Sequence, residues 1–213
     1  MKYPFRIPRL SRLKRRFVTL CKAESGTVTV ETVLSFPVLV WALTASFTFT
    51  DVFRHESILV RSSYAVGDLV SSSSKVSPAD IDGFYSFLRR MNDTPLPIRM
   101  RLSLIGWDED EEELRVVWTN SDHAGSEGAL DDATLNGPMA SRIPEITRSG
   151  ETLLLTETWM DYEPPFRVGL SALTLREMTL MRPRFAPGIE YDDPAAPPPP
   201  PGWCEFVVDG CEM

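Results

Sequence analysis

Histidine and cysteine are scarce in this sequence, whose 213 residues include two histidines and three cysteines. His55 and His123 lie far apart in the chain and neither stands next to a cysteine, which argues against a zinc site. The sequence also has no spaced nucleophile and base and no glycine-rich phosphate-binding loop. We therefore predict no catalytic residues, no metal ion and no cofactor, and we expect a protein that is not an enzyme.

Basic residues are outnumbered by acidic ones and are unevenly placed. The formal net charge is −8, which argues against a nucleic-acid partner. The first 25 residues nevertheless hold eight of the 22 Lys and Arg residues and only one of the 30 acidic ones. A basic arm directly ahead of an apolar run is the usual signal for membrane topology. The basic residues of the arm are Lys2, Arg6, Arg9, Arg12, Lys14, Arg15, Arg16 and Lys22.

One long apolar run follows the basic arm. It extends over 24 residues, from Thr27 to Thr50, with Glu31 as its one charged residue. At about 1.5 Å per residue, a helix of this length reaches roughly 36 Å, enough to cross a hydrocarbon core of about 30 Å. Because a basic flank stays in the cytoplasm, we predict a single-pass protein whose later residues lie outside the cytoplasm. Pro37 removes one helix hydrogen bond and should kink the span.

A cleaved secretory signal is the alternative interpretation of this run. Its best cut, after Ala45, would place Leu43 where a small residue is required, and its apolar core would contain Glu31 and Pro37. A lipoprotein signal does not fit, because Cys21 precedes the apolar run instead of following it.

Glu31 needs a partner or a function if it enters the membrane, because a carboxylate there costs about 2.5–3.5 kcal/mol on insertion scales. One interpretation is a side chain that extends back to the cytoplasmic surface, since Glu31 lies close to the start of the run. The spacing from Gly26 favours a second interpretation. The segment Glu24–Glu31 resembles a class III prepilin-peptidase site, in which a basic leader ends in glycine and glutamate is the fifth residue of the mature helix. Thr32 departs from the tyrosine that Flp-type sites usually carry.

A wider pattern supports the resemblance. Pro37 follows Glu31, and the apolar run exits through Phe53 and Arg54, as in the TadE-like pseudopilins of tight-adherence (Tad/Flp) pili. This similarity covers about 30 residues of the chain. A length of 213 residues argues against the major pilin, because Flp pilins are very small.

The resemblance implies a mechanism and a set of partners. A prepilin peptidase would cut between Gly26 and Thr27, and Glu31 would then pair with the new α-amine of Thr27 on a neighbouring subunit. The implied partners are other pilin-like subunits, Tad inner-membrane assembly proteins, the peptidase and membrane lipid. The implied location is the bacterial inner membrane, with a cytoplasmic N-terminus and a periplasmic domain. Two other functions stay open: a pseudopilin of a type II secretion system, and an unprocessed membrane-anchored binding or scaffolding domain.

The rest of the sequence predicts an α+β fold like that of pilins: a long N-terminal helix, a short second helix and an antiparallel sheet of about four strands. Ser77 and Pro78 form a helix start, and the helix should end near Met91. Strands are expected at 98–104, 114–118, 151–162 and 171–181. The expected divisions are a leader (1–26), the span (27–50), two helices (51–92), a β domain (93–185) and a tail (186–213).

The sequence also predicts the local structure of three further segments. Six consecutive acids, from Asp108 to Glu113, are expected at the tip of a hairpin and fit a calcium loop less well. Residues 120–150 are rich in Gly, Ser, Asn and Asp and are expected to form a long surface loop. Regular structure should fade after Arg182, and Pro197–Pro201 should form an extended spacer. Because a compartment outside the cytoplasm is oxidising, we predict a disulfide between Cys204 and Cys211, with two unpaired thiols as the alternative. Trp203–Val208 is expected to dock as an edge strand.

Overall fold

A computed structural model describes residues 27–109, 111–144 and 151–194. The fold is α+β, as the sequence predicts. The chain forms two compact units. We call residues up to Phe49 together with Phe166–Leu170 the helix unit, and Thr50–Pro165 together with residues from Ser171 on the sheet unit.

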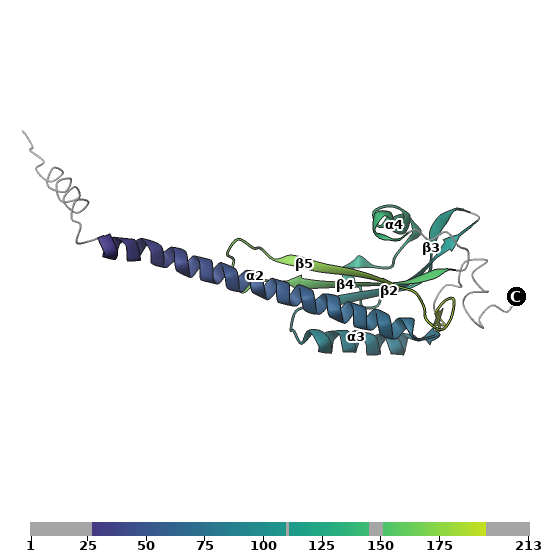
Figure 1. Ribbon diagram of the computed structural model, residues 1–213. Coiled ribbons are helices and arrows are strands. Elements are labelled where there is room, and N and C mark those ends of the chain that lie inside the picture. The colour runs from purple at the N-terminus through teal and green to yellow at the C-terminus, as the bar shows by residue number, and fades with distance from the viewer. Residues whose placement is uncertain (1–26, 110, 145–150, 195–213) are drawn as a thin grey trace, which may run out of the picture. The chain divides into compact units, whose positions relative to one another are not determined.

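The longest element is α2 (Thr27–Ser71), a helix of 45 residues that continues through Pro37 (Figure 1). It ends at Ser71, the first of four consecutive serines. The hydroxyls of Ser71 and Ser72 donate to the carbonyls of Asp68 and Leu69, at 2.9 and 2.7 Å. Such local side-chain hydrogen bonds compete with helix propagation.

Four antiparallel strands form the main sheet, in the order β3-β2-β4-β5, which confirms the predicted sheet. They are β2 (Ile98–Asp108), β3 (Glu113–Asn120), β4 (Thr152–Tyr162) and β5 (Leu173–Met181). The acidic run does lie at the tip of the β2–β3 hairpin. Arg115 there pairs with Asp108 at 3.1 Å and with Glu111 at 2.5 Å, which offsets part of the repulsion among the acids.

One face of the sheet packs against the sheet-unit part of α2 and against α3 (Pro78–Asn92) (Figure 1). Leu59, Val66 and Val70 of α2 are buried on this side, whereas Leu69 is 42% exposed. Gly67 allows the close approach of helix and sheet, because an added Cβ would lie 3.1 Å from the sulfur of Met181. Helix α3 begins with a capping box between Ser77 and Asp80, which confirms the predicted start.

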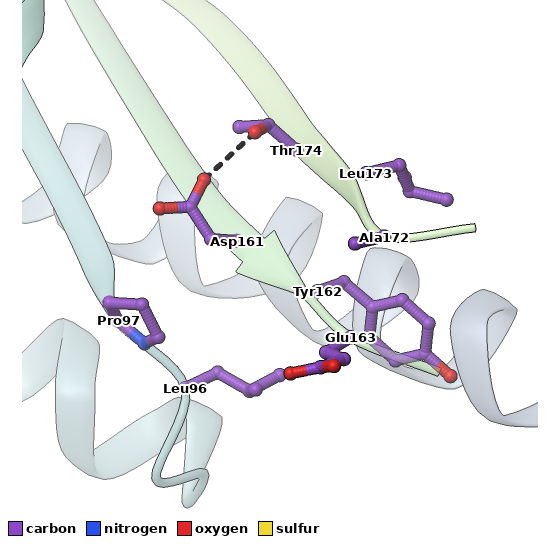
Figure 2. Close-up of a pocket in the computed structure, with 8 residues that line it drawn as sticks. All are labelled: Leu96, Pro97, Asp161, Tyr162, Glu163, Ala172, Leu173 and Thr174. Carbon is purple, nitrogen blue, oxygen red and sulfur yellow. Dashed lines mark hydrogen bonds between the residues drawn. The ribbon is translucent and has the colours of Figure 1, made fainter. Parts of the chain in front are cut away.

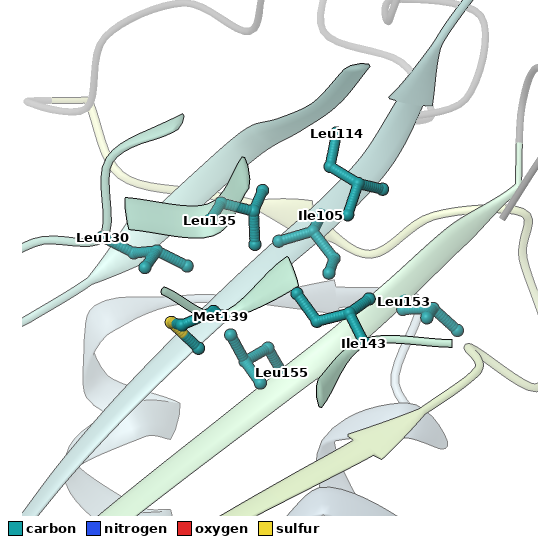
Figure 3. Packing of buried hydrophobic residues seen from close by; sticks show 8 residues of the cluster. All are labelled: Ile105, Leu114, Leu130, Leu135, Met139, Ile143, Leu153 and Leu155. Atoms are coloured by element: carbon teal, nitrogen blue, oxygen red, sulfur yellow. The ribbon is translucent and has the colours of Figure 1, made fainter. Parts of the chain in front are cut away.

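The segment that covers the other face of the sheet differs from its prediction. Residues 120–150 are not simply a surface loop, because their described part folds into short helices over β2 and β4: η2 (Gly125–Glu127), α4 (Asp132–Asn136) and η3 (Ala140–Arg142). Although the segment is mostly polar, four of its apolar side chains are buried against the sheet. These four, Leu130, Leu135, Met139 and Ile143, form one core cluster with Ile105, Leu114, Leu153 and Leu155 (Figure 3).

Helix α4 also protects the edge of the sheet. Asp132 accepts a hydrogen bond from the backbone N–H of Val116 at 2.7 Å. Asn136 accepts from the N–H of Leu114 at 3.0 Å and donates to its carbonyl at 2.7 Å. Two side chains one helical turn apart thus occupy backbone groups of β3 that a further strand would otherwise use.

A second correction concerns the residues after Arg182, where regular structure does not simply fade. Strand β6 (Glu190–Tyr191) pairs in parallel with β1 (Lys75–Val76). The ammonium group of Lys75 contacts the carboxylate of Glu190 at 3.0 Å, and both this hydrogen bond and Asp192 raise the pKa of Lys75. The indole of Trp118 donates to the carbonyl of Ile189 at 2.7 Å, so this segment closes onto the sheet unit.

Candidate functional site

The predicted site residues differ in how far the structure describes them. Gly26, Cys204 and Cys211 lie outside the described residues, as does the proline-rich spacer. Thr27 is the first residue of α2. Glu31 and Pro37 lie in the helix-unit part of α2, and this part is the candidate functional site.

The apolar side chains of this part of α2 are exposed on all sides of the helix. Val28 and Leu43 are each 75% exposed, and Trp41 is 61% exposed. A helix that is apolar all round belongs in a protein core or in a membrane. The described residues provide no such core here. The exposed apolar set is Val28, Val30, Val33, Leu34, Phe36, Val38, Leu39, Val40, Trp41, Leu43, Phe47 and Phe49.

The threonines of this part direct their hydroxyls back to the helix. Thr32 donates to the carbonyl of Val28 at 2.7 Å, and Thr44 donates to that of Val40 at 2.8 Å. Thr48 makes the same bond to Thr44 at 2.9 Å. A hydroxyl bonded within its own helix avoids the desolvation cost of an unpaired one in an apolar environment.

Glu31 is the exception among these side chains. It is exposed, and it makes no hydrogen bond or ion pair with any other residue that the structure describes. Six residues further on, Pro37 lacks the N–H that would otherwise bond the carbonyl of Val33. The site therefore combines an apolar cylinder with one carboxylate near the start of the described helix.

A polar cluster in the sheet unit lies directly after the apolar run. The hydroxyl of Tyr162 donates to the carboxylate of Asp51 at 2.7 Å. Nδ1 of His55 lies 3.0 Å from the carbonyl oxygen of Asp51, and the centres of the His55 and Tyr162 rings lie 5.3 Å apart. Burial and the neighbouring carboxylate raise the pKa of Tyr162 to about 12. Sequence reasoning missed this cluster, because Tyr162 is 111 residues from its partner.

We expect Tyr162→Phe to destabilise the sheet unit by about 1.5–3 kcal/mol, because a hydrogen bond to a charged group is lost. The raised pKa also sets a pH dependence. The folded state holds the phenol proton more tightly than the unfolded state, so this stability is present below pH 10.0 and is lost as pH rises toward about 12. Chemical denaturation at several pH values measures both effects.

Tyr64→Phe is the matched control, because Tyr64 lies on α2 with 51% of its surface exposed. It should leave both the midpoint and its alkaline pH dependence unchanged. If the two variants had the same denaturation midpoint at every pH, the hydrogen bond from Tyr162 to Asp51 would contribute nothing to stability.

A pocket of about 410 Å³ opens where β4 ends and β5 begins (Figure 2). Leu96, Pro97 and Leu173 provide apolar walls. Asp161 is its main charged group, but it already pairs with Arg99 and accepts from Thr174, both at 2.8 Å. Both bonds go to Oδ1 of Asp161, which holds this carboxylate in place, and we assign no function to the pocket.

Charged side chains also meet inside the sheet unit. The carboxylate of Glu157 is fully buried and accepts from Arg101 on one oxygen, at 2.5 and 2.7 Å. Its other oxygen accepts from Arg176 at 2.7 Å. Both guanidinium groups lie over the ring of Trp159, 5.3 and 5.6 Å from its centre. This cluster joins three neighbouring strands and has no opening of its own, so we assign it to stability.

Within residues 27–109, 111–144 and 151–194, no three His, Cys, Asp or Glu side chains are grouped so as to hold a metal ion. Comparisons with protein-family models, with curated proteins and with solved structures find no match to this chain.

Proposed function

We propose that this chain is a minor, pilin-like subunit that is anchored in a membrane by α2 and serves in the assembly of a tight-adherence pilus. The observation that carries the proposal is the set of exposed apolar side chains on α2 between Val28 and Phe49, together with Glu31. In this proposal the span holds the protein in the membrane and also provides the surface on which subunits associate.

The energetic balance favours insertion of α2 into lipid. Full burial of one Val, Leu or Phe side chain is worth about 1.5–3 kcal/mol. The dozen exposed apolar side chains together therefore contribute on the order of 20 kcal/mol. Glu31 opposes this with only about 2.5–3.5 kcal/mol. A single carboxylate therefore does not prevent the helix from spanning a bilayer.

Glu31 gives the proposal its specificity. In lipid an unpaired carboxylate is unfavourable, and a positive group from another helix removes that cost. The α-amine of Thr27 on a neighbouring subunit is such a group once a peptidase has cut after Gly26. Association of subunits then depends on processing, because the positive charge at Thr27 does not exist in the uncut chain.

The order of elements is consistent with this proposal. A long N-terminal helix followed by an antiparallel sheet is also the arrangement of pilin subunits, although this is an analogy at the level of fold. The sheet unit has a well-packed core and internally satisfied charges. These features suit a domain that serves as a structural part of an assembly.

Membrane topology provides the first test. Alkaline phosphatase, which is active only outside the cytoplasm, is fused after Met213 of the whole chain. We expect high activity there, because the basic arm retains the N-terminus in the cytoplasm. The control fusion, after Ser25 and ahead of the span, should be inactive. An inactive fusion after Met213 combined with active enzyme after Ser25 contradicts the proposed orientation.

N-terminal sequencing of the mature wild-type protein provides the second test. A start at Thr27 supports processing by a prepilin peptidase. A start at Met1 favours the unprocessed membrane-anchored domain instead. If the protein starts at Thr27, co-purification with Tad assembly proteins, as opposed to type II secretion components, distinguishes the two kinds of pseudopilin.

A further inference from the structure

The loop between β4 and β5 belongs to the helix unit. Residues Phe166–Leu170 form one compact unit with the apolar part of α2, although the strands on either side of the loop belong to the sheet unit. The rings of Phe47 and Phe166 meet edge to face, with centres 6.3 Å apart and planes at 70°. This geometry is favourable for a pair of aromatic rings.

The loop has the chemistry of a membrane-interface segment. Phe166 is 50% exposed in spite of its contact with Phe47, and Val168 and Leu170 are half-buried. Its only charged residue is Arg167. The backbone N–H of Val168 donates to the carbonyl of Phe166 at 3.0 Å, and Gly169 has φ of 77°, so the segment turns tightly.

The contact with Phe47 sets the level of the loop along α2. Phe47 lies four residues before Asp51, the first charged residue after the apolar run, and this spacing is about 6 Å along the helix axis. Phe166 therefore lies level with the end of the apolar run. Trp and Tyr are enriched at this level in membrane proteins, and Phe is used on the apolar side of interfacial segments, where long basic side chains reach the headgroups.

We propose that the Phe166–Leu170 loop is a second membrane contact, in which Phe166 enters the interfacial layer of the non-cytoplasmic leaflet beside α2. The proposal rests on the proposed function, because it requires that α2 spans the bilayer. A lipid surface fits the loop better than a protein partner does. The exposed apolar area comes mainly from one ring, whereas a specific protein interface buries about 1,000 Å² or more.

Spin labelling in vesicles tests the proposal on the full-length chain. Cys21, Cys204 and Cys211 are first replaced by Ser, and one nitroxide is attached through Val168→Cys. The protein is reconstituted in vesicles of phosphatidylcholine and phosphatidylglycerol, and accessibility of the label to oxygen and to a water-soluble nickel complex is measured. Labels through Leu39→Cys, in the proposed span, and Ser86→Cys, on the exposed side of α3, provide the two reference environments.

We expect position 168 to resemble position 39, with an oxygen-to-nickel ratio several-fold above that of position 86. Addition of Phe166→Asp should lower the ratio at 168 to that of position 86. Addition of Phe185→Asp should not, because Phe185 is 76% exposed in the sheet unit. The reference labels at 39 and 86 should not respond to either change.

Three other results overturn the inference. If 39 lies in lipid and 168 is accessible to nickel, the loop is in water and the proposed span still stands. If 168 is shielded from both oxygen and nickel, protein covers the loop. If 39 itself is accessible to nickel, the span fails, and the lipid contact of the loop fails with it.

Discussion

Glu157→Gln is expected to destabilise the sheet unit by about 3 kcal/mol, because it leaves a buried guanidinium without its counter-charge. Arg101 has a side chain only 6% exposed, so water cannot replace the lost carboxylate. Arg176 is 39% exposed and can be hydrated, so its contribution is smaller. The Gln amide also presents an NH₂ group where one of the two arginines now donates.

Thermal unfolding of the full-length protein in detergent measures this effect. For a unit of this size, about 3 kcal/mol corresponds to a fall in Tm of roughly 6–12 °C. Glu177→Gln is the matched control, because Glu177 is the neighbouring acid on β5, and burial and the charge of Glu56 raise its pKa. Loss of that charge should leave the Tm unchanged or slightly higher. Equal Tm values for wild type and Glu157→Gln would rule out the proposed contribution of the cluster.

Replacing all three charged residues of the cluster with apolar ones distinguishes the contribution of charge pairing to stability from that of packing. When Arg101→Met, Glu157→Leu and Arg176→Met are combined, no charge is left unpaired, and the cost of desolvating three charges disappears. We expect this triple variant to be more stable than Glu157→Gln alone. Some loss should remain, because Arg101 also donates to the carbonyls of Glu127 and Gly128, at 3.4 and 3.1 Å.

Gly26→Val and Glu31→Gln are expected to fail at different stages, and this difference decides the function. If the chain is processed as proposed, valine in place of Gly26 blocks the peptidase, so the leader should remain attached. Glu31→Gln removes a cost of membrane burial, so the protein should insert and be cut normally. Its association with pilin-like subunits should nevertheless fall sharply, because the α-amine of Thr27 on the neighbour then lacks a carboxylate partner.

Two conservative variants provide controls for this pair. Gly26→Ala retains a small residue and should be processed, while Glu31→Asp retains the charge and should support at least part of the assembly. Intact mass gives the processing state, and co-purification with wild-type subunits gives the association. If the wild-type protein begins at Met1 and both principal variants assemble normally, Glu31 only extends to the membrane surface and the anchored-domain function is favoured.

Much of the sheet unit could be predicted from local sequence patterns. The start of α3 at Ser77 and Pro78 follows from a cap that satisfies backbone N–H groups within one turn. The β2–β3 hairpin follows from an apolar alternation interrupted by a run of acids, and the end of α2 follows from its serines. In each of these cases the interacting residues lie within a few positions of one another, so a short stretch of sequence is enough to predict the structure.

The burial of β2 on both faces was not predictable in this way. The alternation in Ile98–Leu104 predicts one buried face, yet Arg101 and Ser103 on the other face are buried as well. They are covered by the 120–150 segment, whose glycines and polar residues predict a loop. Its one available signal was the spacing of Leu130, Leu135, Met139 and Ile143, each four or five residues apart.

The features behind the proposed membrane helix and the side-chain clusters can also be divided into those that follow from the sequence and those that depend on the tertiary structure. The apolar run, the basic arm and the Gly26–Glu31 spacing depend only on composition and order along the chain, because a bilayer selects a helix by its length and hydrophobicity. The contacts of Tyr162 with Asp51, of Glu157 with two arginines and of Phe166 with Phe47 join residues at least 19 positions apart. Strand register and packing bring these partners together, and neither can be read from the residues that flank each side chain.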